Sequence, residues 1–339
     1  MTRLIPLAAP LIALLAFAAC NGGGDPQPTG PTATPFVIIG TPGGSLPSPG
    51  ETVAPTGGMT ETPAPTGELV SLDWLAGSAA FPAVPSPFAA PVVDPDLLAA
   101  IEGALGGLDG EFSVIVHSLA DGRYAAINPN ATYYAASLFK AAVLLEAYRQ
   151  RDLGTIDFST ELTIDEEVAQ YDLGTFEYLG LEEGDKVLLG EAIEAMIVVS
   201  DTALANLVLA EVGSGNVDAT LRSIGATTMS VNTRDLPTTA ADMYAVLSAI
   251  ATGDGVSEGS RQEMLSLMAQ EWFRSGVVAG IPAGTPFAHK TGSFTDATHD
   301  VAVVEGRAGP YIIAVLSDRS YQWEPIAAGS AAVWGHFAN

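Results

Sequence analysis

Cysteine and lysine are scarce in this chain of 339 residues. One cysteine is present, so no internal disulfide can form. Lysine occurs three times, and lysine and arginine together number 13 against 39 acidic residues, for a formal net charge of −26. Such an anionic surface repels phosphate backbones, so we expect no nucleic acid partner.

Histidine is also rare, and its four positions form no known metal-binding pattern. The chain contains no H-E-x-x-H sequence, and one cysteine cannot make a paired-cysteine site. It also has no G-x-S-x-G turn of the kind that carries the nucleophile of α/β-hydrolases. We therefore expect neither a metal nor another cofactor.

The first twenty residues have the features of an export signal. Arg3 precedes an apolar run over residues 11–17, and Ala18 and Ala19 precede Cys20. The position of Cys20 resembles the lipobox of bacterial lipoproteins, which implies a diacylated cysteine and a membrane anchor on the extracytoplasmic side. The alternative is a secretory signal that is cut after Ala18, which would give a secreted protein.

Residues 21–91 differ in composition from the rest of the chain. They hold 14 of the 23 prolines and no lysine or arginine, and Glu51–Gly57 is repeated with one change as Glu61–Gly67. Such sequence lacks the bulky side chains needed to offset the entropy of ordering, which predicts a disordered tether. Only Leu69–Pro91 is apolar enough for part of it to pack onto the following domain.

Residues 92–339 are predicted to form one domain of two lobes. Residues 137–268 have mainly helical patterns, and a closing helix is predicted over 326–337. Short β-rich runs occupy residues 112–116, 124–127, 287–291, 300–304 and 311–316. Strands at both ends with helices between them predict an α+β fold, in which one antiparallel sheet of about five strands is flanked by helices and carries an inserted helical lobe.

Three short motifs contain residue types that are common in catalytic sites, and two of the motifs contain a lysine. The motifs are Ser137-Leu138-Phe139-Lys140, Ser200-Asp201-Thr202 and Lys290-Thr291-Gly292. Ser137 and Lys140 share a helix face at i and i+3, so the amine can lie beside the hydroxyl. Lys140 can accept the serine proton only if its pKa is lowered, which burial and the nearby charge of Lys290 would achieve.

Each motif alone also has a purely structural interpretation. Ser137 can be a helix cap followed by a surface lysine, and Ser200 or Asp201 can cap the next helix. Lys290-Thr291-Gly292 can be an ordinary strand end, although a glycine there lets a ligand backbone approach closely.

The three motifs in this order resemble those of the penicillin-recognising serine enzymes, which include class A β-lactamases and penicillin-binding proteins. The resemblance covers residues 96–337 and extends to the stretches Tyr134–Tyr148, Thr238–Met243 and Lys290–Val304. It implies the β-lactamase/transpeptidase-like fold and an acyl-enzyme mechanism.

The resemblance also implies a role for each motif residue. Ser137 is the nucleophile, Lys140 accepts its proton, and Ser200 relays a proton to the departing nitrogen. The substrate-binding residues are Thr202, Lys290, Thr291, Gly292 and Ser293. Lys290 and Thr291 would hold the substrate carboxylate, and the N–H groups of Ser137 and Ser293 would form the oxyanion hole.

Two departures from the family pattern bear on function. The middle motif ends in Thr202 instead of asparagine, and a hydroxyl cannot offer both an amide donor and a carbonyl acceptor. The segment 228–237, which occupies the place of the Ω-loop, contains no glutamate to activate the deacylating water. Its one carboxylate, Asp235, either pairs with Arg234 or a neighbour or acts as a base.

Three functions are compatible with this sequence. The first is a β-lactamase-like serine hydrolase that is acylated by β-lactams and hydrolyses the acyl-enzyme slowly. The second is a D-Ala-D-Ala carboxypeptidase or penicillin-binding-protein-like enzyme that acts on peptidoglycan peptides. The third is a non-catalytic envelope lipoprotein that binds peptidoglycan or senses antibiotic. In each case we expect a monomer.

Overall fold

The computed structural model describes residues 72, 81, 88–108 and 110–338. The predicted signal peptide, residues 1–20, lies outside the described residues, and the predicted tether, residues 21–91, overlaps them only at 72, 81 and 88–91. No helix among the described residues has the length and apolar character needed to cross a bilayer.

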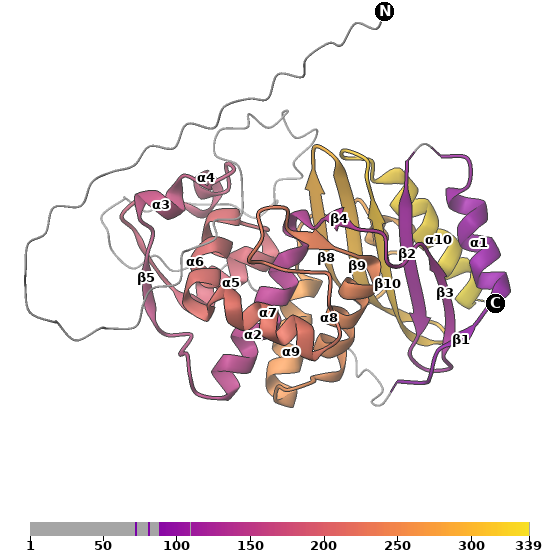
Figure 1. Cartoon of the computed structure of the whole chain (residues 1–339), viewed down its shortest axis with the longest axis horizontal. Coiled ribbons are helices and arrows are strands. Elements are labelled where there is room, and N and C mark those ends of the chain that lie inside the picture. The colour runs from indigo at the N-terminus through magenta and orange to yellow at the C-terminus, as the bar shows by residue number, and fades with distance from the viewer. Residues whose placement is uncertain (1–71, 73–80, 82–87, 109, 339) are drawn as a thin grey trace, which may run out of the picture. The chain divides into compact units, whose positions relative to one another are not determined.

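A sheet of six strands forms one half of the domain (Figure 1). Its spatial order is β1-β3-β2-β10-β9-β8, so strands from both ends of the domain meet at its centre. The strands are β1 (Val92–Val93), β2 (Phe112–Ser118), β3 (Arg123–Ile127), β8 (Phe287–Phe294), β9 (Ala297–Gly306) and β10 (Gly309–Ser317). This arrangement confirms the predicted α+β fold and adds one strand to the expected five.

The central pair of the sheet joins segments that are about 200 residues apart in sequence. In antiparallel β2 and β10, Ile115 is opposite Ala314, and in β8 and β9 Lys290 is opposite Val301. The added strand β1 departs from the antiparallel prediction, because it runs parallel to β3.

The two faces of the sheet bury different sets of side chains. Val114 and Val116 of β2 pack with α1 (Pro95–Leu105) and α10 (Glu324–Ala338), which cover one face (Figure 1). Ile115 belongs to the larger core that includes the helical lobe. This alternation follows from the two-residue period of a strand and explains the continuous apolar run of β2.

The helical lobe occupies the sequence between β4 and β8. Its longer helices, α2 and α5 to α9, supply most of the larger core, and α2 lies at its centre with every residue from Phe139 to Tyr148 buried. The helices are η1 (Ala136–Leu138), α2 (Phe139–Asp152), α3 (Glu166–Ala169), α4 (Phe176–Leu179), α5 (Leu189–Val198), α6 (Thr202–Val212), α7 (Ser214–Ser223), α8 (Ala240–Thr252), α9 (Glu258–Ala269) and η2 (Val277–Gly280).

Two small antiparallel pairs complete the lobe. β4 (Tyr133–Tyr134) pairs with β7 (Pro237–Thr238), and β5 (Glu161–Thr163) pairs with β6 (Lys186–Leu188). The first pair fixes the chain just before Ser137 against the end of the segment 228–237.

Part of the apolar sequence before the domain packs onto it, as the composition predicted. Leu72 and Phe81 are buried in the larger core, and Phe88 packs against it. The backbone N–H of Leu72 donates to Glu191 Oε1 at 3.0 Å. The folded unit therefore recruits residues upstream of the predicted boundary at residue 92.

Candidate active site

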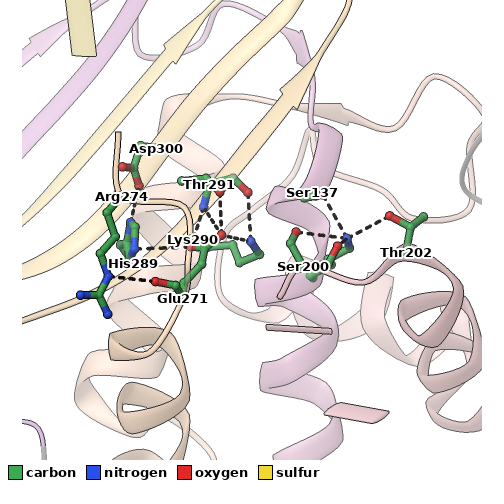
Figure 2. Close-up of polar contacts among 10 residues, drawn as sticks. Ser137, Ser200, Thr202, Glu271, Arg274, His289, Lys290, Thr291 and Asp300 are labelled. Atoms are coloured by element: carbon green, nitrogen blue, oxygen red, sulfur yellow. Dashed lines mark hydrogen bonds and ion pairs between the residues drawn. The ribbon is translucent and has the colours of Figure 1, made fainter. Parts of the chain in front are cut away.

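The ammonium group of Lys140 is the centre of a cluster of hydroxyl groups. It donates to Ser137 Oγ at 3.0 Å, to Ser200 Oγ at 3.3 Å and to Thr202 Oγ1 at 3.1 Å. The carbonyl oxygen of Ser200 also accepts from it, at 2.5 Å. The lysine is fully buried, whereas the three hydroxyl-bearing residues are half-buried. The structure thus brings four of the predicted site residues together (Figure 2).

The surroundings of Lys140 favour its neutral form. Burial, and then the positive charge of Lys290, lower the pKa of Lys140 to about 7, although the carboxylates of Asp201 and Glu271 oppose this change. These are the two influences that the sequence predicted. A lysine with this pKa is substantially neutral at physiological pH and can accept the Ser137 proton.

Ser137 lies in η1, which leads directly into α2. Its neighbour Ala136 has a left-handed backbone with φ of 46°, an uncommon conformation for a residue with a Cβ atom. The N–H of Ala135 donates to the carbonyl of Leu236 at 2.8 Å, so β4 and the segment before β7 hold this turn from outside. Backbone strain of this kind clusters at functional sites.

In the middle motif, Asp201 caps a helix, whereas Ser200 and Thr202 contact Lys140. Asp201 accepts from the N–H of Leu204 at 2.6 Å and so caps α6. Ser200, with φ of 57°, does not cap the helix, because its side chain faces Lys140. The structural interpretation thus applies to Asp201 alone.

The strand β8 carries Lys290, Thr291, Gly292 and Ser293 along the edge of the sheet next to η1. A Cβ atom at Gly292 would lie 3.0 Å from the carbonyl oxygen of Ala135 and 3.1 Å from Leu138 Cγ. Only glycine therefore lets this edge approach the turn that bears Ser137 without displacement.

The backbone of β8 offers donors on its outer edge. The N–H of Thr291 points away from β9 and donates to Glu271 Oε2 at 2.9 Å. Alternate residues of a strand point their N–H groups to the same side, so the N–H of Ser293 faces the same edge.

Glu271 is a site residue that the sequence analysis missed. It is fully buried just after α9, forms an ion pair with Lys290 and accepts from Thr291 Oγ1 at 2.6 Å (Figure 2). A buried lysine needs a counterion in a low-dielectric interior, and that requirement was the one available signal for a carboxylate here.

Two histidines lie beside the site without reaching the hydroxyl cluster. His289 is buried between Glu271 and Asp300, with Nδ1 3.1 Å from Asp300 Oδ1. His299 accepts from the N–H of Ser317 and donates through Nε2 to the carbonyl of Tyr134 at 2.8 Å, and burial lowers its pKa to about 4. His299 is therefore neutral and structural. The described residues contain no group of three or more potential ligands placed to hold a metal ion.

Asp235 does not form the ion pair that was one of its two predicted roles. Asp235 and Arg234 are both exposed and, although both belong to the described residues, they form no ion pair with each other.

The arrangement as a whole provides the parts for acyl transfer. It offers an accessible serine, a buried amine within hydrogen-bond distance, a second serine on the same amine, and a strand edge with outward N–H groups. Lys290, on the same strand, is buried and paired with Glu271.

Comparisons with known proteins bear on the fold and the family of the chain. No curated protein matches the chain. Among solved structures, PBP-A is 21% identical with a TM-score of 0.69 and covers 74% of this chain and 99% of its own. A beta lactamase from Xanthomonas campestris is 22% identical with a TM-score of 0.64, covering 73% of this chain and 100% of its own.

An ancestral class A beta-lactamase is 27% identical with a TM-score of 0.63, and it covers 71% of this chain and 98% of its own. A model of the beta-lactamase enzyme family matches residues 96–337, which is most of the chain and coincides with the span of the sequence resemblance. With the fold and the motif geometry already described, this match shows that the chain belongs to the beta-lactamase enzyme family, within the penicillin-recognising serine hydrolase superfamily.

Proposed function

We propose that this protein is a serine hydrolase that forms an acyl-enzyme on Ser137 with β-lactams or related amides and hydrolyses it slowly. The observation that carries the proposal is the 3.0 Å contact between Lys140 Nζ and Ser137 Oγ. Lys140 is fully buried and its pKa is lowered to about 7, so it can act as a general base at neutral pH.

Acylation follows from these contacts. Ser137 Oγ attacks the carbonyl carbon while its proton passes to Lys140, and the tetrahedral oxyanion accepts from the N–H groups of Ser137 and Ser293. The C–N bond then breaks as Ser200 Oγ, 3.3 Å from Lys140 Nζ, gives its proton to the departing nitrogen and receives from Lys140 the proton that came from Ser137. The carbonyl carbon remains as an ester on Ser137.

Thr202 and Gly292 shape the space for the substrate. The Thr202 hydroxyl oxygen accepts from Lys140 at 3.1 Å, which leaves its own hydrogen to be donated toward the substrate amide. Gly292 keeps β8 close enough to η1 for the substrate to bridge the strand edge and Ser137.

Slow release is proposed because hydrolysis of the ester needs a base positioned on a water molecule. The segment 228–237 contains no glutamate, and its one aspartate, Asp235, is exposed. Of the two buried carboxylates whose charge acts on Lys140, Asp201 caps α6, and the oxygens of Glu271 are engaged by Lys290 and by the N–H and hydroxyl of Thr291.

Intact-protein mass spectrometry after a pulse of benzylpenicillin tests this function. We expect rapid conversion to a stable penicilloyl adduct in the native protein and none in Ser137→Ala. Prompt return to the unmodified mass with product accumulation would contradict slow release, and an adduct in Ser137→Ala would contradict the role of Ser137.

A second candidate is a D-Ala-D-Ala carboxypeptidase of the penicillin-binding-protein type. The absence of a glutamate from the segment 228–237 favours it, because an enzyme of this type is acylated by penicillin without needing to release the adduct quickly. A mutant of PBP-A has been solved as an acyl-enzyme complex with penicillin G. Release of D-alanine from a peptide ending in D-Ala-D-Ala, without turnover of nitrocefin, would support this candidate over the first.

A purely binding role for the protein is the weakest of the three. A binding module has no need of a nucleophile together with its base, and Ser137, Lys140 and Ser200 are all present and in contact. Labelling by a fluorescent penicillin in the native protein, and its loss in Ser137→Ala, would exclude a non-catalytic lipoprotein.

We also propose that the protein is exported and anchored by lipid on Cys20, as a monomer that binds no nucleic acid. The support is the signal-like sequence before Cys20 and the excess of acidic residues. Mass spectrometry of the mature N-terminus tests the anchor, and an unmodified terminus formed by cleavage after Ala18 would refute it.

A further inference from the structure

The side chain of Glu271 occupies a distinctive place in the site. It lies between Lys290, with which it forms an ion pair, and His289, whose Nε2 is 3.7 Å from Glu271 Oε2. Thr291 donates to it twice, through the N–H at 2.9 Å and through the hydroxyl at 2.6 Å. Figure 2 shows these contacts, together with the Arg274 side chain, which donates to the Glu271 carbonyl at 3.1 Å.

The donors that Glu271 engages are the ammonium group of Lys290 and the hydroxyl of Thr291. These are the two groups that the family resemblance assigns to the carboxylate of the substrate. In this chain a carboxylate of the protein itself holds both of them. The substrate carboxylate thus has an internal competitor for the same hydrogen bonds.

Glu271 is held on one side by Lys290 and Thr291, and on the other side it lies against His289, which Asp300 binds. Asp300 holds His289 through Nδ1 at 3.1 Å and accepts from the N–H of Val277 at 2.7 Å. Glu271, His289 and Asp300 are all fully buried, so the carboxylate cannot swing out into solvent without leaving Lys290 unpaired in the interior.

The local charge also disfavours a second anion. Lys290 and Glu271 form a neutral pair, and residues 92–339 carry 12 basic against 34 acidic side chains, a net charge of −22. A substrate carboxylate placed next to Thr291 would meet the Glu271 carboxylate within the same cluster, and the excess of acidic side chains in the domain would oppose its approach.

From these contacts we infer that Glu271 is a specificity-determining residue, which makes the site prefer acyl donors with no carboxylate on the leaving-group side of the scissile amide. This inference rests on the proposed function. It names the substrate class as amides whose leaving group is neutral, such as internal peptide bonds or esterified β-lactams. Carboxylate-bearing penicillins react at Ser137 but lose the advantage of an ionic anchor.

A matched pair of substrates tests the inference. Benzylpenicillin carries its carboxylate on the carbon next to the lactam nitrogen, and its methyl ester is neutral there. We would measure the rate constant for acylation by each compound using intact-protein mass spectrometry. The readout is the acylation rate constant of the acid divided by that of the ester. A loss of folded protein affects both rate constants equally and cancels in this ratio.

Glu271→Gln keeps the shape of the side chain and removes its charge. We expect the ratio of acid to ester to rise about tenfold in this variant, because Lys290 then becomes a free cation. Glu146→Gln is the control, since Glu146 is also a buried glutamate that accepts from a hydroxyl, that of Thr220 at 2.5 Å. Its ratio should equal the native one.

A ratio in Glu271→Gln that stays within about twofold of the native ratio would overturn the inference. The ratio measured for the native protein tests the inference even if the variant does not fold. A native ratio near or below one supports the inference, and acylation by the acid about a hundredfold faster than by the ester contradicts it.

If neither compound acylates the native protein, the proposed function is wrong. A separate measurement then tests whether Glu271 keeps Lys290 from binding a carboxylate. The three lysines give a simple nuclear magnetic resonance spectrum after labelling with ¹³C-lysine. Added acetate should shift the Lys290 signal in Glu271→Gln and leave it unmoved in the native protein. An equal shift in both proteins would overturn the inference.

Discussion

Two of the three lysines of this chain are fully buried, and the protein accommodates their charge in different ways. Lys140 is hydrogen-bonded to hydroxyl and carbonyl oxygens, and its burial, followed by the positive charge of Lys290, lowers its pKa to about 7. Lys290 has a carboxylate partner in Glu271. One lysine is thereby suited to act as a base, and the other remains paired.

The rate of acylation should depend on pH through Lys140. Because the neutral amine is the active form, the rate constant should fall about tenfold for each pH unit below 7 and level off above it. Lys140→Arg, which cannot lose its proton, should reduce acylation by about a thousandfold. Mass spectrometry of acylation between pH 5 and pH 9 measures both effects.

Lys186→Arg, in β6, is the matched control for this experiment and should follow the native profile. A rate that stays constant from pH 5 to pH 9, or near-native acylation of a folded Lys140→Arg variant, would exclude Lys140 as the base.

The i and i+3 spacing predicted that the Lys140 amine lies beside the Ser137 hydroxyl. The places of Ser200 and Thr202 were expected only from the family resemblance. Glu271 escaped prediction for a physical reason. It follows the end of α9 in no recognisable motif, and it meets Lys290 only after the chain has passed through η2 and entered β8. A long-range pairing of that kind has no local signature in sequence.

At the scale of elements, the contact between β8 and η1 decides whether the site forms. The strand carries Lys290 and Ser293, the turn carries Ser137, and Gly292 is the point of closest approach between them. The site therefore depends on the fit of two elements that are about 150 residues apart.

Gly292→Ala should weaken acylation more than it weakens folding. The added Cβ would lie 3.0 Å from the carbonyl oxygen of Ala135, so β8 must shift by a few tenths of an ångström away from Ser137. We expect a loss of about ten- to a hundredfold in the acylation rate constant, measured with benzylpenicillin.

Gly103→Ala in α1 is the control, because a Cβ there meets nothing within 4 Å and the helix favours alanine. If Gly292→Ala acylated at the native rate, the close fit between β8 and η1 would have no part in catalysis.

The long strands and the closing helix were predictable because their apolar patterns extend over five or more residues. The pairs β4–β7 and β5–β6 were not predicted, since strands of two or three residues carry too little pattern. The parallel strand β1 was missed for the same reason, although its two valines have high strand propensity.

At the scale of the whole molecule, the folded domain includes residues from the predicted tether. Leu72 and Phe81 are buried in the core, and Glu191 binds the N–H groups of Leu72 and Leu188 at once. Composition predicted this packing in outline, but not which residues would take part.

A shortened chain beginning at residue 92 should be less stable than one beginning at residue 68. It lacks Leu72 and Phe81, and burial of each such side chain contributes about 1.5–3 kcal/mol. We expect the free energy of unfolding in urea to fall by about 3 kcal/mol or more. Equal urea midpoints for the two chains would show that these contacts contribute nothing to stability.

The central claim is that Ser137 is the nucleophile of an acyl-transfer site activated by Lys140. Peptide mapping of the native protein after brief exposure to benzylpenicillin tests it most directly. We predict one penicilloyl group, attached to Ser137 in the peptide that also contains Lys140. Attachment to any other residue, or no attachment at all to the folded protein, would contradict the claim.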